Sequence, residues 1–202
     1  MSHEIIEWGV AAQVREGESL SGDQYLVKQI DGRILVAVID GIGHGPEAAE
    51  ASRMAVAVLE AKANQQLVSL FAYCHKALHG TRGVVMSLAA IDEGDNQMTW
   101  LGVGNVEGRL LRANKTSSHP EETLLLRNGV VGHTIPSSLI ISGLPMEKGD
   151  ALILATDGIR HEFTIGLHIG RSAHMIANDI LATHNKGNDD ALVMVVKYRG
   201  GG

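Results

Sequence analysis

Residues 23–40 read DQYLVKQIDGRILVAVID, two β-prone runs separated by Asp31-Gly32. Asp-Gly between such runs is a strong hairpin signal, because its backbone readily adopts the tight turn that joins two antiparallel strands. A two-residue turn at these positions also sets the register of the hairpin, and it places Asp23 opposite Asp40. The sequence therefore predicts a hairpin that carries two facing carboxylates at the end remote from its turn.

Further along the chain, blocks of predicted strands alternate with blocks of predicted helices. Helices are expected at residues 47–63, which Pro46 opens, 65–79 and 172–184. Strands are expected at residues 24–29, 34–39, 84–91, 98–103, 108–112, 123–127, 138–142, 151–156 and 191–198, with 84–112 forming a meander. Hairpins dominate and strict β-α-β alternation is absent. This pattern predicts an α+β fold of largely antiparallel sheets covered by helices.

The composition of the chain excludes several classes of function. The chain has 202 residues, 45% of them hydrophobic, which suits one domain with a proper core. Its net charge of -6 argues against nucleic-acid binding, which needs many cationic side chains. The single cysteine, Cys74, excludes an internal disulfide and fits a reducing compartment. No signal peptide or membrane-length apolar run is present, so we expect a cytoplasmic protein.

Aspartates fall at the ends of several predicted strands. Asp23 and Asp40 flank the hairpin, Asp157 follows residues 151–156, and Asp189-Asp190 precede the last strand. A single Asp in such a place is usually a turn former, but several at one edge repel one another and attract cations. An all-oxygen set of this kind suits Mg²⁺ or Mn²⁺. The pattern predicts a divalent-metal site, and two such ions can activate a bridging water and bind a phosphoryl oxygen.

Other chemistries lack their signatures. The glycine-rich run from Asp40 to Pro46 has no Gly-Lys-Ser/Thr, which excludes a P-loop, and Pro46 replaces the last Gly of a dinucleotide fingerprint. No Gly-x-Ser-x-Gly motif marks a nucleophilic serine. The ten histidines are scattered without metal-binding spacing.

Taken together, four short motifs resemble the metal-dependent PPM (PP2C-type) protein phosphatases, in their bacterial SpoIIE/RsbX-like branch. The motifs are Ser21-Gly22-Asp23, Val38 to Gly45, Gly149-Asp150 leading to Ala155 to Ile159, and Asn188 to Val193. The stretches 104–109 and 128–132 fit the same branch. The order and spacing of the motifs cover nearly the whole chain.

The resemblance implies a single PPM-type domain over residues 1–202, an α-β-β-α sandwich of two antiparallel sheets flanked by helices. It also implies two Mn²⁺ or Mg²⁺ ions. Carried over by position, Asp40 bridges both ions and the Gly41 carbonyl binds the first. Asp157 and Asp189 bind the second, with Asp190 the alternative to Asp189. Asp23 also belongs to the implied metal site and orients metal-bound water.

Two further residues are assigned by the same resemblance. His44 is a candidate proton donor to the leaving seryl oxygen, and the alternative is a polar loop residue near the metals. The chain has no clear match to the basic residue near the start of larger relatives that holds the phosphate, and Arg15 is the candidate for that role.

The implied activity is hydrolysis of phosphoserine or phosphothreonine on partner proteins, with STAS-domain components of the stressosome as the expected substrates. Neither a nucleic acid nor a membrane is an expected partner. Two alternatives remain at this point. One is a catalytically inactive PPM-fold module that binds phosphoproteins, and the other is a hydrolase of small phosphoesters.

Overall fold

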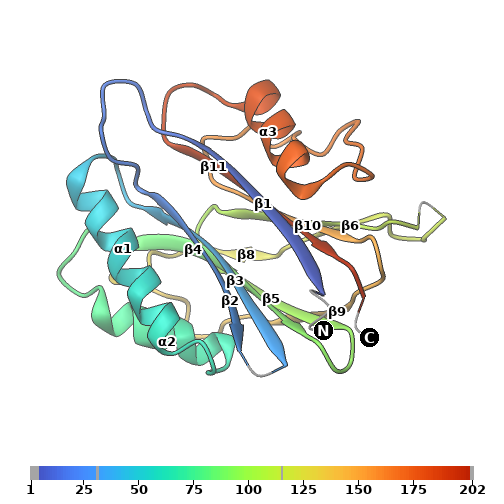
Figure 1. Cartoon of the computed structure of the whole chain (residues 1–202). Coiled ribbons are helices and arrows are strands. Elements are labelled where there is room, and N and C mark those ends of the chain that lie inside the picture. The colour runs from blue at the N-terminus through green and yellow to red at the C-terminus, as the bar shows by residue number, and fades with distance from the viewer. Residues whose placement is uncertain (1–4, 31, 115, 201–202) are drawn as a thin grey trace.

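The computed structural model describes residues 5–30, 32–114 and 116–200 and shows two stacked sheets (Figure 1). The β1 sheet has the strand order β1 (Ile6–Gln13), β11 (Ala191–Tyr198), β10 (Ala151–Ala155), β6 (Glu107–Leu111) and β7 (Glu121–Thr123). The β2 sheet has the order β2 (Asp23–Ile30), β3 (Arg33–Gly41), β4 (Val84–Asp92), β5 (Gln97–Val103) and β8 (Leu126–Arg127), with β9 (Ser142–Pro145) also paired to β5.

Helices cover the outer faces of both sheets. Helices α1 (Pro46–Ala61) and α2 (Leu67–Ala77) pack on the β2 sheet, whereas α3 (Ala173–His184) packs on the β1 sheet (Figure 1). The predicted α+β fold, an α-β-β-α sandwich, is confirmed. In the described part of the chain, no helix has both the length and the apolar character needed to cross a bilayer.

Strand periodicity explains this layering. In β3, Val36 and Val38 point into the core between the sheets, and their neighbours Leu35, Ala37 and Ile39 point toward α1 and α2. Successive side chains of a strand face opposite sides, so a strand covered on both faces is apolar throughout. The central strand β11 follows the same rule between the core and α3.

The hairpin register is confirmed. Asp23 lies opposite Asp40, and the ladder runs without a bulge to Ile30 opposite Arg33. Gly32 adopts a positive φ of 77°, as a tight turn requires, while Asp31, the other residue of the predicted turn, lies outside the described residues.

The predicted meander over residues 84–112 was wrong. Strands β4 and β5 do pair, but β6 belongs to the other sheet and pairs with β10. The chain crosses between the layers at Gly104, whose φ is 101°. Gly104 also packs closely against Val85, since a Cβ at this position would lie 2.1 Å from a Val85 methyl carbon. The turn between β5 and β6, which the sequence predicts to be a hairpin, therefore carries the chain from one sheet to the other.

Two other strand predictions need correction, and one strand was missed. The predicted strand 123–127 is divided between β7 and β8, in different sheets, because Leu124 turns into the core between them. Residues 138–141 are not in a strand, and the pairing residues start at Ser142. Strand β1 was not predicted, since Gly9 interrupts its apolar pattern. A Cβ at Gly9 would meet the backbone of His174 at 2.4 Å, so close packing of α3 accounts for that glycine.

Candidate active site

The predicted carboxylates gather at one end of the sandwich, where β2 and β3 meet the end of β10 and the start of β11. Asp23 is buried, and its Oδ2 accepts a hydrogen bond from Thr156 Oγ1 at 2.8 Å. The Thr156 hydroxyl oxygen also accepts from the backbone N–H of Leu192 at 2.9 Å. One hydroxyl thus connects both sheets directly behind the acidic edge.

Asp190 is buried, and both of its carboxylate oxygens accept backbone hydrogen bonds. It is only 4% exposed, its Oδ1 accepts from the backbone N–H of Arg15 at 2.8 Å, and its Oδ2 accepts from the N–H of Gly22 at 2.7 Å. Asp189 is less buried and accepts only from the N–H of Asp190, at 2.9 Å, among the residues described. Because both Asp190 oxygens are engaged by the protein, the geometry favours Asp189 as the metal ligand.

Substitution of these neighbours is expected to separate the two roles. Asp190→Asn replaces one acceptor by a donor that faces a backbone N–H, so the free energy of unfolding should fall by about 2–3 kcal/mol. Asp189→Asn should leave the unfolding midpoint in denaturant almost unchanged but weaken metal binding, measured by titration calorimetry. The reverse assignment, with Asp190 as the ligand, predicts the opposite pattern in the same two measurements.

Asp157 is held by residues that the sequence did not single out for this role. Asn105 Nδ2 donates to Asp157 Oδ2 at 2.8 Å, and Lys186 Nζ donates to the Asp157 carbonyl at 2.6 Å. The only sequence signal was the Gly104-Asn105 turn inside one of the stretches that fit the phosphatase branch. The Asn105 contact fixes one Asp157 oxygen and so sets the direction in which the other points.

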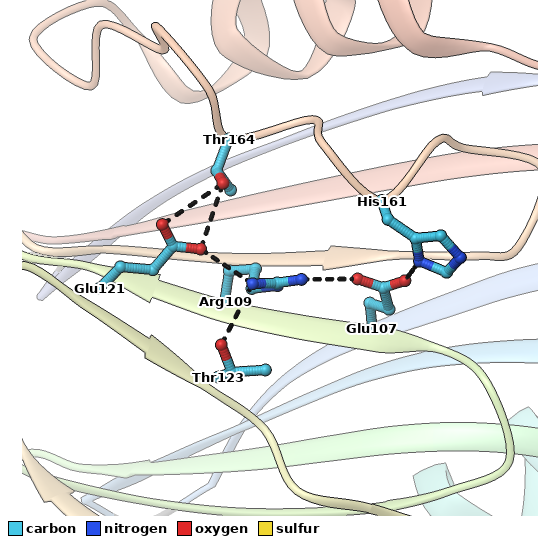
Figure 2. Close-up of polar contacts among 6 residues, drawn as sticks. All are labelled: Glu107, Arg109, Glu121, Thr123, His161 and Thr164. Atoms are coloured by element: carbon cyan, nitrogen blue, oxygen red, sulfur yellow. Dashed lines mark hydrogen bonds and ion pairs between the residues drawn. The ribbon is translucent and has the colours of Figure 1, made fainter.

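The segment that follows Asp157 is anchored by a polar network around Arg109 (Figure 2). Arg109 Nη1 lies 3.1 Å from Glu121 Oε1 and 3.1 Å from Thr123 Oγ1, and Nη2 lies 3.1 Å from Glu107 Oε2. From the segment itself, His161 contacts Glu107, and Thr164 donates to Glu121 at 3.1 Å. These contacts tie the loop after β10 to the β6–β7 pair, so Asp157 starts a segment with a fixed path.

Two glycines next to ligand candidates are required by close packing. A Cβ at Gly41 would lie 2.3 Å from the carbonyl oxygen of Ala48 in α1, and one at Gly158 would lie 2.0 Å from the carbonyl oxygen of Asp190. Close packing thus explains why glycine stands at both positions. Each glycine lets another backbone segment pack directly behind an aspartate.

His44 and Arg15 lie beside the cluster with different surroundings. His44 is exposed, and its Nδ1 is 2.6 Å from Glu18 Oε1. Its role as a proton donor stays a prediction. Arg15 is half-buried and gives its backbone N–H to Asp190, while its guanidinium has no hydrogen bond or ion pair within the described ranges. A guanidinium without an intramolecular partner, on a residue whose backbone contacts Asp190, is compatible with phosphate binding.

Burial and mutual repulsion make this edge electrostatically costly. Burial raises the pKa of both Asp40 and Asp23, and the surrounding carboxylates raise each pKa further. Burial also raises the pKa of Asp157, with Asp189 adding to the shift, whereas Lys186 and Asn105 oppose it. A divalent cation relieves this kind of strain, because it neutralises several carboxylates at once.

The chemical type of the candidate ligand atoms fits a hard divalent ion. Every candidate ligand is an oxygen, from the carboxylates of Asp40, Asp157 and Asp189 and from the Gly41 carbonyl, as Mg²⁺ and Mn²⁺ prefer. Within residues 5–30, 32–114 and 116–200, no three Asp, Glu, His or Cys side chains converge closely enough to chelate one ion. The fit therefore depends on the backbone carbonyl as well as on the side chains.

The two sheets, their helices and this acidic edge define the chain as a phosphatase of the PP2C-type class. The model of the Stage II sporulation protein E (SpoIIE) family matches residues 30–199, and the chain belongs to that family.

Individual relatives agree with this assignment. The phosphoserine phosphatase RsbX of Bacillus subtilis is 28% identical over 186 residues, covering 87% of this chain and 86% of RsbX. A structure of RsbX in complex with magnesium shares 27% identity and a TM-score of 0.85, covering 98% of both chains. A chain solved in work on the bacterial stressosome shares 34% identity and a TM-score of 0.88, covering 96% of this chain and all of the other.

Proposed function

We propose that this protein is a divalent-metal-dependent phosphatase that removes phosphate from serine or threonine of partner proteins. The observation that carries the proposal is the meeting of Asp23, Asp40, Asp157 and Asp189 at one end of the two sheets. Similarity to RsbX, a phosphoserine phosphatase, supports the reaction, and the RsbX structure with magnesium supports a divalent ion.

In the proposed site, Asp40, the Gly41 carbonyl, Asp157 and Asp189 hold two Mn²⁺ or Mg²⁺ ions. Such ions lower the pKa of water and neutralise charge on the phosphoryl oxygens. Asn105 and Lys186 position Asp157 for this task.

The remaining residues act on the water and on the leaving group. Asp23 orients the attacking water, and its own position is set by the hydrogen bond from Thr156. His44 gives a proton to the leaving seryl oxygen, and Glu18 orients the imidazole through its contact with Nδ1.

For the substrate we propose STAS-domain components of a stressosome, in the cytoplasm. The support is the similarity to RsbX and to a chain solved in work on the bacterial stressosome. The net charge of -6 is unfavourable for competing polyanionic partners such as nucleic acids.

The test is phosphate release from a kinase-phosphorylated STAS-domain protein, with Mn²⁺, with Mg²⁺ and with EDTA. Release that needs a divalent ion and exceeds release from free phosphoserine supports the proposal. Equal turnover of free phosphoserine favours a small-phosphoester hydrolase. Metal binding without release from this substrate or a generic phosphoprotein contradicts the enzymatic proposal and favours a phosphoprotein-binding module.

A further inference from the structure

A cleft of about 750 Å³ opens beside the acidic edge, between the loop after Asp40 and the turn before β4. It is lined by Ile42, Pro46, Glu47, Glu50, Arg82 and His133, among others. Ile42 directly follows Gly41, so the cleft begins one residue from a proposed metal ligand. A chain bound at the acidic edge can therefore place neighbouring residues in this opening.

The walls of the cleft are held in place by several contacts. The Ile42 N–H donates to the Gly83 carbonyl at 3.1 Å, which joins the loop after Asp40 to the turn before β4. Arg82 pairs with Glu47 at 2.5 Å, and its Nη1 lies 2.7 Å from where a Cβ on Gly43 would be. A binding site with preformed walls loses little conformational entropy when it is filled.

The lining combines apolar surface with an excess of negative charge. Ile42 is 37% exposed at this site, although it is large and apolar. The lining holds two carboxylates, Glu47 and Glu50, and one guanidinium, that of Arg82, which pairs with Glu47. The Glu50 side chain is 58% exposed, and its only ion-pair partner in the described part of the chain is Arg53, a surface pair three residues along the same helix. Such a pair is weak, so Glu50 can accept a second cation.

We propose that this cleft binds the segment of a protein substrate that flanks its phosphorylated residue, with an apolar side chain against Ile42 and a basic side chain at Glu50. The inference rests on the proposed function, since it names the part of the substrate that the same site recognises. An extended segment advances about 3.4 Å per residue, so residues within a few positions of the phosphorylated one reach the cleft.

Two synthetic phosphoserine nonapeptides test this proposal, one with Leu and Arg on both sides of the phosphoserine and one with Ala at those positions. The full-length protein should hydrolyse the Leu/Arg peptide with a kcat/KM about tenfold higher. Glu50→Arg should lower that value about fivefold through KM, because it removes an attraction and adds a repulsion. Hydrolysis of p-nitrophenyl phosphate should be unchanged, because this molecule is too small to reach the cleft while its phosphate lies at the acidic edge.

Glu60→Arg is the matched control, since Glu60 is exposed on the same helix but does not line the cleft. Equal hydrolysis of the two peptides, or an equal effect of Glu60→Arg, would overturn the proposal. If the wild-type protein hydrolyses no phosphate ester, the proposed function fails. Fluorescence anisotropy of the labelled peptides in EDTA then tests separately whether the cleft binds them. A lower Kd for the Leu/Arg peptide that Glu50→Arg abolishes supports the cleft, and equal Kd values reject it.

Discussion

Asp40→Asn is expected to reduce phosphatase activity by roughly a thousandfold while making the metal-free protein more stable. Activity should fall because Asp40 is the proposed ligand shared by both ions. Stability should rise because burial raises the pKa of Asp40, repulsion from nearby carboxylates such as Asp23 and Asp157 raises it further, and no hydrogen bond to the Asp40 carboxylate is seen in the described residues. We expect the melting temperature in EDTA to rise by about 3 °C, which corresponds to about 1 kcal/mol for a chain of this length.

The measurement is a pair of thermal melts, in EDTA and in excess Mn²⁺, beside an activity assay. The wild-type protein should gain stability with Mn²⁺ by mass action, whereas Asp40→Asn should gain little. Asp95→Asn, in the exposed turn at the far end of β4, serves as the control and should match the wild type in both conditions. Full activity in Asp40→Asn would remove Asp40 from the mechanism.

Gly158→Ala should be the most destabilising single-methyl change that the site offers. The new Cβ would lie 2.0 Å from the Asp190 carbonyl oxygen and 2.9 Å from the Cα of Ala191, both backbone atoms at the start of β11. Side chains can rotate away from a clash, but here a strand must shift. We expect a loss of about 3 kcal/mol in the free energy of unfolding, measured by urea denaturation.

The same substitution should also lower activity in the fraction that remains folded, because displacing Asp190 moves Asp189 with it. Gly170→Ala provides the control, since a Cβ there meets nothing within 4 Å. It should change the free energy of unfolding, measured by urea denaturation, by less than about 0.5 kcal/mol. A Gly158→Ala protein as stable as Gly170→Ala would show that the two segments are not in tight contact.

The sequence was sufficient for features set by local chemistry. Asp31-Gly32 fixed the hairpin register and so placed Asp23 opposite Asp40, as the ladder shows. The strand ends at which the sequence places Asp157 and Asp189 also meet, because β10 and β11 pair antiparallel with Ala155 opposite Val193.

Features that depend on distant segments were not predictable. Nothing local to Thr156 indicates that its hydroxyl reaches Asp23, because the two lie in different sheets. The crossing at Gly104 has the composition of an ordinary turn, and only packing between the layers decides which sheet the next strand joins. Strand β1 was missed for a related reason, since its central Gly9 is explained by α3, far along the chain.

The position of β11 has a consequence for how the protein matures. This strand is the last element of the chain, yet it lies between β1 and β10 in the sheet and carries Asp189 at its entrance. During synthesis β1 and β10 leave the ribosome before β11, the strand that pairs with both of them, so this part of the sheet stays incomplete until β11 is available. The acidic edge therefore forms only after β11 has inserted between β1 and β10, and a chain cut before Asp189 lacks a complete site.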